Sequence, residues 1–144
     1  FFYGYKNHIK VGADSKLITK YCVTPANTAD FQMVEYLIDE KDKELWADSG
    51  YCLKPVFSIL PSHIKTHILE KNTKCHPLTD EQRKNNTEKS KVRVRVEHVF
   101  GHIKNTMNGT NLRSIGIKRV SFDVMLLNLT YNMCRFEFLS RSLA

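Results

Sequence analysis

Short strand-like runs alternate with helical stretches along these 144 residues, and this alternation constrains the fold more than any other feature. Two runs rich in β-branched and aromatic residues, 1–11 and 17–24, flank the turn-forming segment 12–16, which predicts a β-hairpin. Two shorter apolar runs, 45–47 and 66–69, predict further strands. The order strand, strand, helix, strand, helix, strand, helix indicates a mixed α/β fold rather than a helical bundle.

The expected helices begin at recognisable polar residues. Asn27 or Thr28 can cap the first helix, which places Asp30 in its first turn, where the helix dipole favours a carboxylate. A second helix is expected over 53–60. For the long third helix, the clearest start signal is the segment 85–87, with the sequence Asn-Asn-Thr.

Residues 88–107 carry two competing patterns. Over 89–96, Lys and Arg alternate with Ser and Val, a period of two that favours a strand. A longer pattern with steps of three and four residues favours a helix, and it passes through Val92, Val96, Val99, Ile103 and Met107. We predict the helix because its pattern continues past the other. A last helix is expected over 118–139, with an apolar stripe made of Phe122, Met125, Leu126, Leu129 and Met133.

The excess positive charge is confined to the C-terminal part of the chain. Residues 1–80 contain 10 Lys and Arg and 10 Asp and Glu, whereas residues 81–144 contain 12 Lys and Arg and 5 Asp and Glu. A localised basic surface is expected of a protein that binds a phosphate backbone. The alternative is a basic face that serves only solubility.

Composition also bounds the class of protein. The longest apolar stretch, 124–127, is too short to span a membrane. The four cysteines are widely spaced and form no Cys-x-x-Cys pair, so we expect small buried thiols in a reducing cytosol. No Ser-His-Asp, P-loop or dinucleotide-binding glycine pattern occurs. The histidine pairs His63/His67 and His98/His102 lack a third ligand at metal spacing, and we expect the second pair on a solvated or DNA-facing side of its helix.

Two carboxylates stand where a metal site can form. Asp48 follows the predicted strand 45–47, at the strand end where open α/β sheets place ligand-binding groups, although an ordinary turn is the alternative. On a helix, Arg93, Glu97 and Lys104 share one strip, which suits a metal ligand between two cations that contact phosphate. The alternative is an ordinary ion pair between Arg93 and Glu97. Two carboxylates suggest Mg²⁺, and a third is expected.

Five segments resemble the DDE transposases of the insertion sequence five type. The likeness covers nearly the whole chain in order, and its most specific part is the Arg-Val-Glu-His-Val-Phe-Gly block. The segments are Phe2-Tyr3-Gly4-Tyr5-Lys6-Asn7-His8, Val23-Thr24-Pro25-Ala26-Asn27, Ala47-Asp48-Ser49-Gly50-Tyr51, Val92-Arg93-Val94-Arg95-Val96-Glu97-His98-Val99-Phe100-Gly101 and Leu129-Thr130-Tyr131-Asn132-Met133-Cys134-Arg135.

The resemblance implies a ribonuclease H-like mixed sheet flanked by helices, and a triad of two aspartates and one glutamate that binds two Mg²⁺ or Mn²⁺ ions. Asp48 falls on the second aspartate and Glu97 on the glutamate, which makes both catalytic residues and metal ligands. Arg93 and Lys104 fall on the family's arginine and lysine. Ser90 stands where the family has a tyrosine, which puts that residue's contact with DNA in doubt.

The resemblance further implies that residues 1–144 are the C-terminal part of one catalytic domain. The first aspartate belongs to a central strand upstream of residue 1, so we expect the fragment to be inactive alone. The complete enzyme would be a bacterial cytoplasmic protein, nucleoid-associated when bound to DNA. It would act as a homodimer on transposon ends and target DNA, without a membrane or small-molecule cofactor. Lys91 and Arg95 join Arg93 and Lys104 as expected DNA contacts. The alternative is a non-catalytic DNA-binding remnant.

Overall fold

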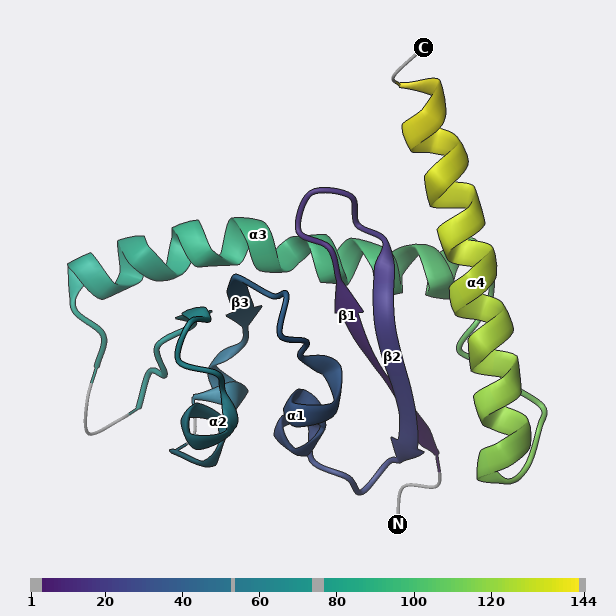
Figure 1. The fold of residues 1–144 in the computed structure, drawn as a ribbon, viewed down its shortest axis with the longest axis horizontal. Coiled ribbons are helices and arrows are strands. Elements are labelled where there is room, and N and C mark those ends of the chain that lie inside the picture. The colour runs from purple at the N-terminus through teal and green to yellow at the C-terminus, as the bar shows by residue number, and fades with distance from the viewer. Residues whose placement is uncertain (1–3, 53, 74–76, 143–144) are drawn as a thin grey trace. The chain divides into compact units, whose positions relative to one another are not determined.

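A computed structural model describes residues 4–52, 54–73 and 77–142 and confirms a mixed α/β chain (Figure 1). The predicted hairpin, the two short strands and the four helical regions all form. Their bounds are β1 (Tyr5–Val11), β2 (Ile18–Pro25), η1 (Asp30–Met33), α1 (Val34–Leu37), β3 (Glu44–Ala47), η2 (Ser49–Tyr51), α2 (Lys54–Ile59), β4 (Lys65–Ile68), α3 (Asp80–Asn105) and α4 (Ile117–Arg141). No helix in the described ranges has the length and apolar character needed to cross a membrane.

The chain divides into two compact units. The hairpin unit consists of Phe1–Thr28 and Arg95–Ala144, and the parallel-strand unit consists of Ala29–Val94. In the first, β1 pairs antiparallel with β2; in the second, β3 pairs parallel with β4, with Trp46 opposite His67. The strands that the structure describes form two two-stranded sheets, one in each unit, and the single mixed sheet implied by the resemblance remains a prediction.

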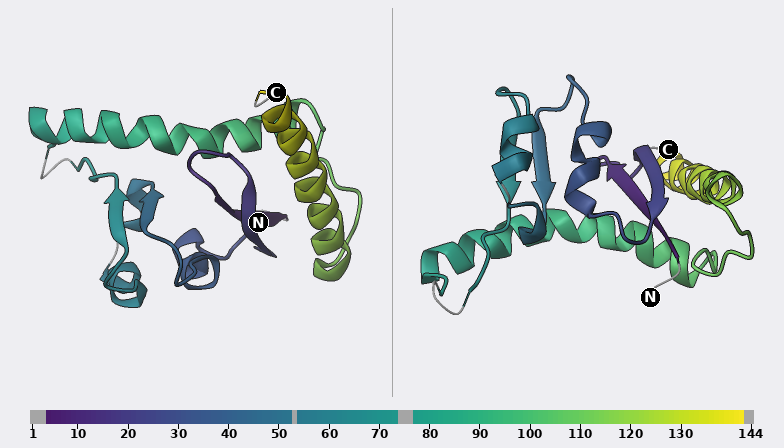
Figure 2. Two further views of the ribbon diagram at one scale, coloured as in Figure 1. Left: turned by 45° about the horizontal axis from the view of Figure 1, so that its top comes forward. Right: turned by 90° about the horizontal axis from the view of Figure 1, so that it is seen from below.

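The core of the hairpin unit lies where β2, α3 and α4 meet. Ile18, Val99, Ile103 and Tyr131 form a buried cluster, with Met107 and residues of the hairpin packed against it. Val99 is fully buried, and burying an aliphatic side chain of this kind stabilises a fold by roughly 1.5–3 kcal/mol. The stripe predicted for the third helix therefore marks its packing face. Figure 2 shows α4 lying along the hairpin.

Polar side chains of α4 fasten the hairpin at its turn. The Asn132 amide accepts a hydrogen bond from Ile18 N (2.9 Å) and donates one to Ile18 O (2.8 Å), as a neighbouring strand would. Tyr131 Oη donates to Lys16 O (2.9 Å), and Arg135 Nε donates to Ser15 O (2.8 Å). Burial raises the pKa of Tyr131, and the positive charge of Arg135 opposes this shift. Tyr131, Asn132 and Arg135 of the segment 129–135 therefore stabilise the hairpin.

A second polar contact joins β1 to α4. Asn128 is 3% exposed, and its amide exchanges hydrogen bonds with the amide of Asn7 at 2.9 and 3.3 Å. A buried polar side chain without such partners would destabilise the fold, so the two amides fix which turns of α4 face the hairpin.

The expected start of the third helix is wrong. α3 begins at Asp80, five residues before the predicted signal, because Thr79 and Gln82 form a reciprocal capping box. Thr79 Oγ1 accepts from Gln82 N (3.3 Å), and Gln82 Oε1 accepts from Thr79 N (2.9 Å). Asn86, which belongs to the predicted start segment 85–87, instead forms hydrogen bonds with both N and O of Glu70 through its side-chain amide.

Two further helix expectations need correction. The first helical segment begins at Asp30 after Ala29, without a side-chain cap, so neither Asn27 nor Thr28 caps it; Asp30 does lie in the first turn. In α4, most of the predicted apolar stripe is exposed, and a different set of residues is buried. The exposed residues are Phe122, Leu126, Leu129 and Met133, whereas the buried ones are Val120, Val124, Asn128 and Tyr131.

Candidate functional site

Asp48 lies at the carboxyl end of β3, directly where the strand passes into η2. It is the N-cap of that short helix, and its Oδ1 accepts a hydrogen bond from Ser49 N at 2.7 Å. The residue is exposed, so the carboxylate can still offer oxygen to a ligand. The predicted position at the end of a strand is confirmed, and the turn that was the alternative is present as well.

The phenol of Tyr51 interacts electrostatically with Asp48 and with Asp30. Burial, together with the negative charges of Asp30 and Asp48, raises the pKa of the Tyr51 phenol to about 12. The short helices η1 and η2, which carry these residues, are in contact within the parallel-strand unit. Two carboxylates therefore act on one buried hydroxyl. Nothing in the sequence pattern indicated that Asp30 belongs near Asp48.

Replacing Asp30 by Asn is expected to lower the pKa of Tyr51 below its value of about 12 in the unchanged chain. An unfolded tyrosine titrates near 10, so the raised value stabilises the fold below pH ~10, and this contribution is lost as pH rises from ~10 to ~12. Tyrosinate absorbance at alkaline pH measures the titration, with Tyr51→Phe identifying the signal. An Asp30→Asn curve superimposable on that of the unchanged chain would contradict the contact.

Glu97 lies on α3, as predicted, with Arg93 one turn before it and Lys104 near the end of the helix. At 100° per residue these three side chains share one strip of the helix. Glu97 and Lys104 are exposed, and Arg93 is half-buried. The strip therefore presents a carboxylate flanked by two cations.

Lys91 and Arg95 have partners of their own. Lys91 Nζ lies 2.6 Å from Glu88 Oε1 on the helix surface. Arg95 binds Asp14 Oδ1 at 3.1 Å and the carbonyl oxygen of Ala13, so it holds the β1–β2 turn against α3. The role of both residues as DNA contacts remains a prediction. Arg95 also has a structural role, because it binds the β1–β2 turn.

The second histidine pair divides between two environments. His98 Nδ1 lies 3.2 Å from Lys16 Nζ at the surface. His102 is half-buried and packs edge-on against the Tyr131 ring, with centroids 5.5 Å apart. The expectation of a solvated or DNA-facing side chain is therefore wrong for His102. The cysteine expectation also fails in part, because Cys52 and Cys134 are exposed free thiols.

No three His, Cys, Asp or Glu side chains within the described ranges gather into a group that could hold a metal ion. Asp48 belongs to the parallel-strand unit and Glu97 to the hairpin unit, so their convergence remains a prediction. Each offers an exposed carboxylate, the ligand type that Mg²⁺ prefers. The donor set thus fits part of a magnesium site and needs at least one further oxygen ligand.

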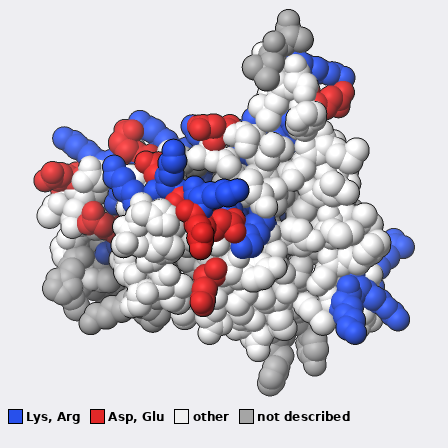
Figure 3. All heavy atoms as spheres, in the orientation of Figure 1, with Lys and Arg blue, Asp and Glu red and all other residues white. Residues whose placement is uncertain are grey.

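A basic surface that the sequence analysis did not single out lies at the beginning of α4. Lys118 and Arg119 occupy the first turn of the helix, and Arg113 precedes it in the loop. Figure 3 shows Lys and Arg side chains without Asp or Glu in this region, whereas both signs of charge mix along the N-terminal half of α3. The concentration of charge in residues 81–144 was visible in the sequence, but its position on α4 was not.

The chain is similar to known proteins over most of its length. The profile of the family described as the transposase DDE domain matches residues 1–133. The transposase for insertion sequence element IS1106 of Neisseria meningitidis serogroup B is 28% identical over 135 residues, covering 92% of this chain and 46% of the relative. The chain thus spans about half the length of that protein. No solved structure matches it significantly.

Proposed function

Because the chain belongs to the transposase DDE domain family, we propose that it forms part of an enzyme that cleaves and rejoins DNA strands during transposition of an insertion sequence. The family match over residues 1–133 is the observation that carries the proposal. We assign the chain to the insertion sequence five type and to the C-terminal part of the catalytic domain. The position of Asp48 at the end of a parallel strand supports this assignment.

The proposed fold is ribonuclease H-like, with the two observed sheets as parts of one. An antiparallel hairpin and a parallel strand pair are both components of such a mixed sheet, and two-stranded sheets are marginally stable by themselves. A further strand outside residues 1–144 would carry the first aspartate and supply the missing pairing partner. The 46% coverage of the relative leaves ample sequence for that strand.

In the proposed site, Asp48 and Glu97 hold divalent cations, with Mg²⁺ or Mn²⁺ as the expected ions. Two such ions can activate an attacking oxygen and stabilise the leaving oxygen in phosphodiester chemistry. Arg93 and Lys104, on the strip that carries Glu97, orient phosphate oxygens beside it. Ser49 N fixes the Asp48 carboxylate through its hydrogen bond and so limits the directions in which that group can bind.

The proposed partners are transposon ends and target DNA, bound by a homodimer of the complete enzyme in the bacterial cytoplasm. Purified residues 1–144 are expected to bind DNA without cleaving it, because the first aspartate is missing. Incubation with a supercoiled plasmid and Mg²⁺ tests this. Metal-dependent nicking that disappears in Asp48→Ala would overturn the inactivity of the fragment while supporting the assigned site.

The alternative function is a DNA-binding remnant whose carboxylates are idle. The excess of 12 Lys and Arg over 5 Asp and Glu in residues 81–144 supports DNA binding in either case. In that case DNA binding would weaken with salt and would respond neither to Mg²⁺ nor to Glu97→Gln. Binding that strengthens with Mg²⁺, and loses this response in Glu97→Gln, would instead favour the catalytic assignment.

The basic start of α4 gives a quantitative prediction for DNA binding. If Lys118 and Arg119 each contact a phosphate, changing both to Gln is expected to reduce the slope of log affinity against log salt by about 2. Fluorescence anisotropy of a labelled duplex at several salt concentrations measures the slope. Arg141→Gln at the other end of α4, where the arginine pairs with Glu137, is the matched control. Equal slopes in both variants would exclude this surface.

A further inference from the structure

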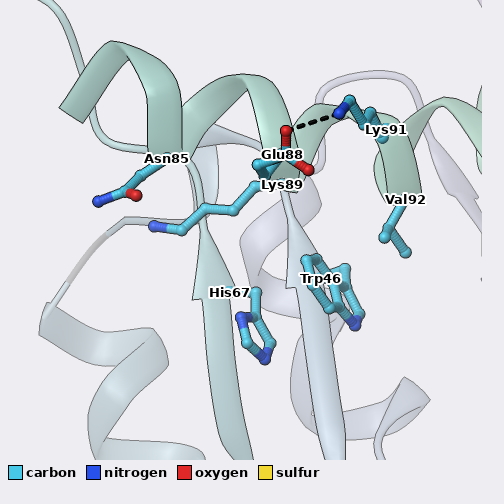
Figure 4. A pocket seen from close by; sticks show the side chains of 7 residues that line it. All are labelled: Trp46, His67, Asn85, Glu88, Lys89, Lys91 and Val92. Carbon is cyan, nitrogen blue, oxygen red and sulfur yellow. Dashed lines mark hydrogen bonds and ion pairs between the residues drawn. The ribbon is translucent and has the colours of Figure 1, made fainter. Parts of the chain in front are cut away.

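An open pocket of about 420 Å³ lies in the parallel-strand unit, and the proposed catalytic residues do not line it. Its volume is within the range of sites that hold small organic ligands. Figure 4 shows two aromatic rings on the strands facing side chains of α3. The lining residues are Trp46 from β3, His67 from β4, and Asn85, Glu88, Lys89, Lys91 and Val92 from α3.

The two rings form a stack that is built into the sheet. Trp46 and His67 are opposite each other in the parallel register of β3 and β4, so both project from the same face. Their centroids are 3.9 Å apart and their planes differ by 8°. Both rings line the pocket, so a flat ring bound there can contact the stack, as nucleobases do on aromatic side chains.

The polar groups around the stack suit a nucleotide. His67 Nε2 is buried and lies 3.7 Å from Glu44 Oε1, so His67 contributes its aromatic surface to the pocket. Asn85 offers both a donor and an acceptor to a base edge. The pocket thus combines an aromatic surface with an amide that can form hydrogen bonds to a base.

Two cations border the same pocket. Lys89 Nζ is held in place by Ile68 O at 3.0 Å, and Lys91 Nζ by Glu88 Oε1 at 2.6 Å. Ammonium groups anchored beside an aromatic stack are suited to the phosphate that adjoins a stacked base.

We propose that this pocket binds one unstacked nucleobase of a DNA strand, which continues the Trp46–His67 stack while Lys89 and Lys91 contact its phosphates. The choice of DNA as the source of the base rests on the proposed function. The base would come from a single-stranded or locally opened segment, because bases inside a duplex have both faces covered by their neighbours.

Trp46 is the single tryptophan of the chain, so its fluorescence reports on the pocket directly. Purified residues 1–144 would be titrated with a single-stranded decanucleotide, the matching duplex and free deoxyadenosine monophosphate. The single strand is expected to quench Trp46 emission saturably and the duplex much less. Quenching by the mononucleotide with an affinity equal to that of the strand would reassign the pocket to free nucleotides and overturn the proposal.

Matched variants separate stacking from general DNA binding. His67→Leu is expected to weaken single-strand binding by roughly 5- to 150-fold, the loss typical of removing one stacking partner. His63→Leu, outside the pocket, should leave it unchanged. Lys91→Gln should weaken binding more than Lys84→Gln on the same helix. Circular dichroism confirms that each variant folds.

The outcomes distinguish this proposal from the proposed function. Tight binding of labelled single-stranded DNA without a change in Trp46 emission would reject the pocket and leave the transposase assignment intact. Equal affinities for His67→Leu and His63→Leu would do the same. Failure of the protein to bind any DNA in the anisotropy measurement would reject both.

Discussion

Glu97→Gln and Asp48→Asn are each expected to lower metal-dependent DNA cleavage more than about 100-fold in a protein that combines residues 1–144 with the first aspartate. Both substitutions keep the shape of the side chain and remove the charge that holds a hard cation. Loss of an outer-shell partner of a metal site already costs about 10- to 100-fold, so loss of a ligand should cost more. Cleavage of an end-labelled transposon end at fixed Mg²⁺ concentration measures the effect.

The control for Glu97 lies on the same helix. Glu81 is an exposed acid in the first turn of α3, and Glu81→Gln should leave cleavage within about twofold of the unchanged protein, as expected of a surface position away from the site. Both catalytic variants should still bind DNA, because each removes a negative charge from a surface that meets phosphate. Unimpaired cleavage in Glu97→Gln and Asp48→Asn would show that these residues are not a shared metal site.

The helical assignment of 88–107 shows what the sequence can predict. The apolar pattern through Val99 and Ile103 was longer than the competing two-residue alternation, and the structure buries these two side chains. The beginning of α3 was missed because a capping box depends on two polar side chains three residues apart. Thr79 and Gln82 stand in a polar stretch where such a pair is easily overlooked.

The packing face of α4 could not be predicted from hydrophobicity. This helix has apolar residues on more than one face, and the face that is buried contains Asn128. The hairpin determines the choice, because its edge and β1 supply hydrogen-bond partners for Asn132 and Asn128. Sequence periodicity records only the spacing of apolar side chains and contains no information about these tertiary partners.

For the candidate site, too, the sequence predicted the local features and not those that depend on tertiary contacts. A carboxylate directly after a short apolar strand is a local pattern, and Asp48 lies where that pattern places it. The influence of Asp30 on Tyr51 depends on contact between two short helices separated by a strand, which no local pattern reports. The pairing of Asp48 with Glu97 rests on family resemblance and stays a prediction that the cleavage experiment addresses.

Asn132→Asp is expected to lower the free energy of unfolding by about 1–3 kcal/mol, because it places an acceptor opposite the carbonyl oxygen of Ile18. The bond from Ile18 N can persist, since Asp retains an acceptor. At acid pH a protonated carboxyl again donates to Ile18 O, so the destabilisation should shrink as pH falls. Urea unfolding at several pH values, followed by circular dichroism, measures both effects.

Thr130→Asp provides the matched control, because it adds the same charge to an exposed position of α4 two residues away. It is expected to change stability by no more than about 0.5 kcal/mol, as surface substitutions usually do. Equal losses of unfolding free energy in the two variants would show that the negative charge added to α4 causes the effect. A loss in Asn132→Asp that does not vary with pH would point to packing rather than hydrogen bonding. If the prediction holds, Asn132 stabilises the hairpin through its two hydrogen bonds to the backbone of Ile18.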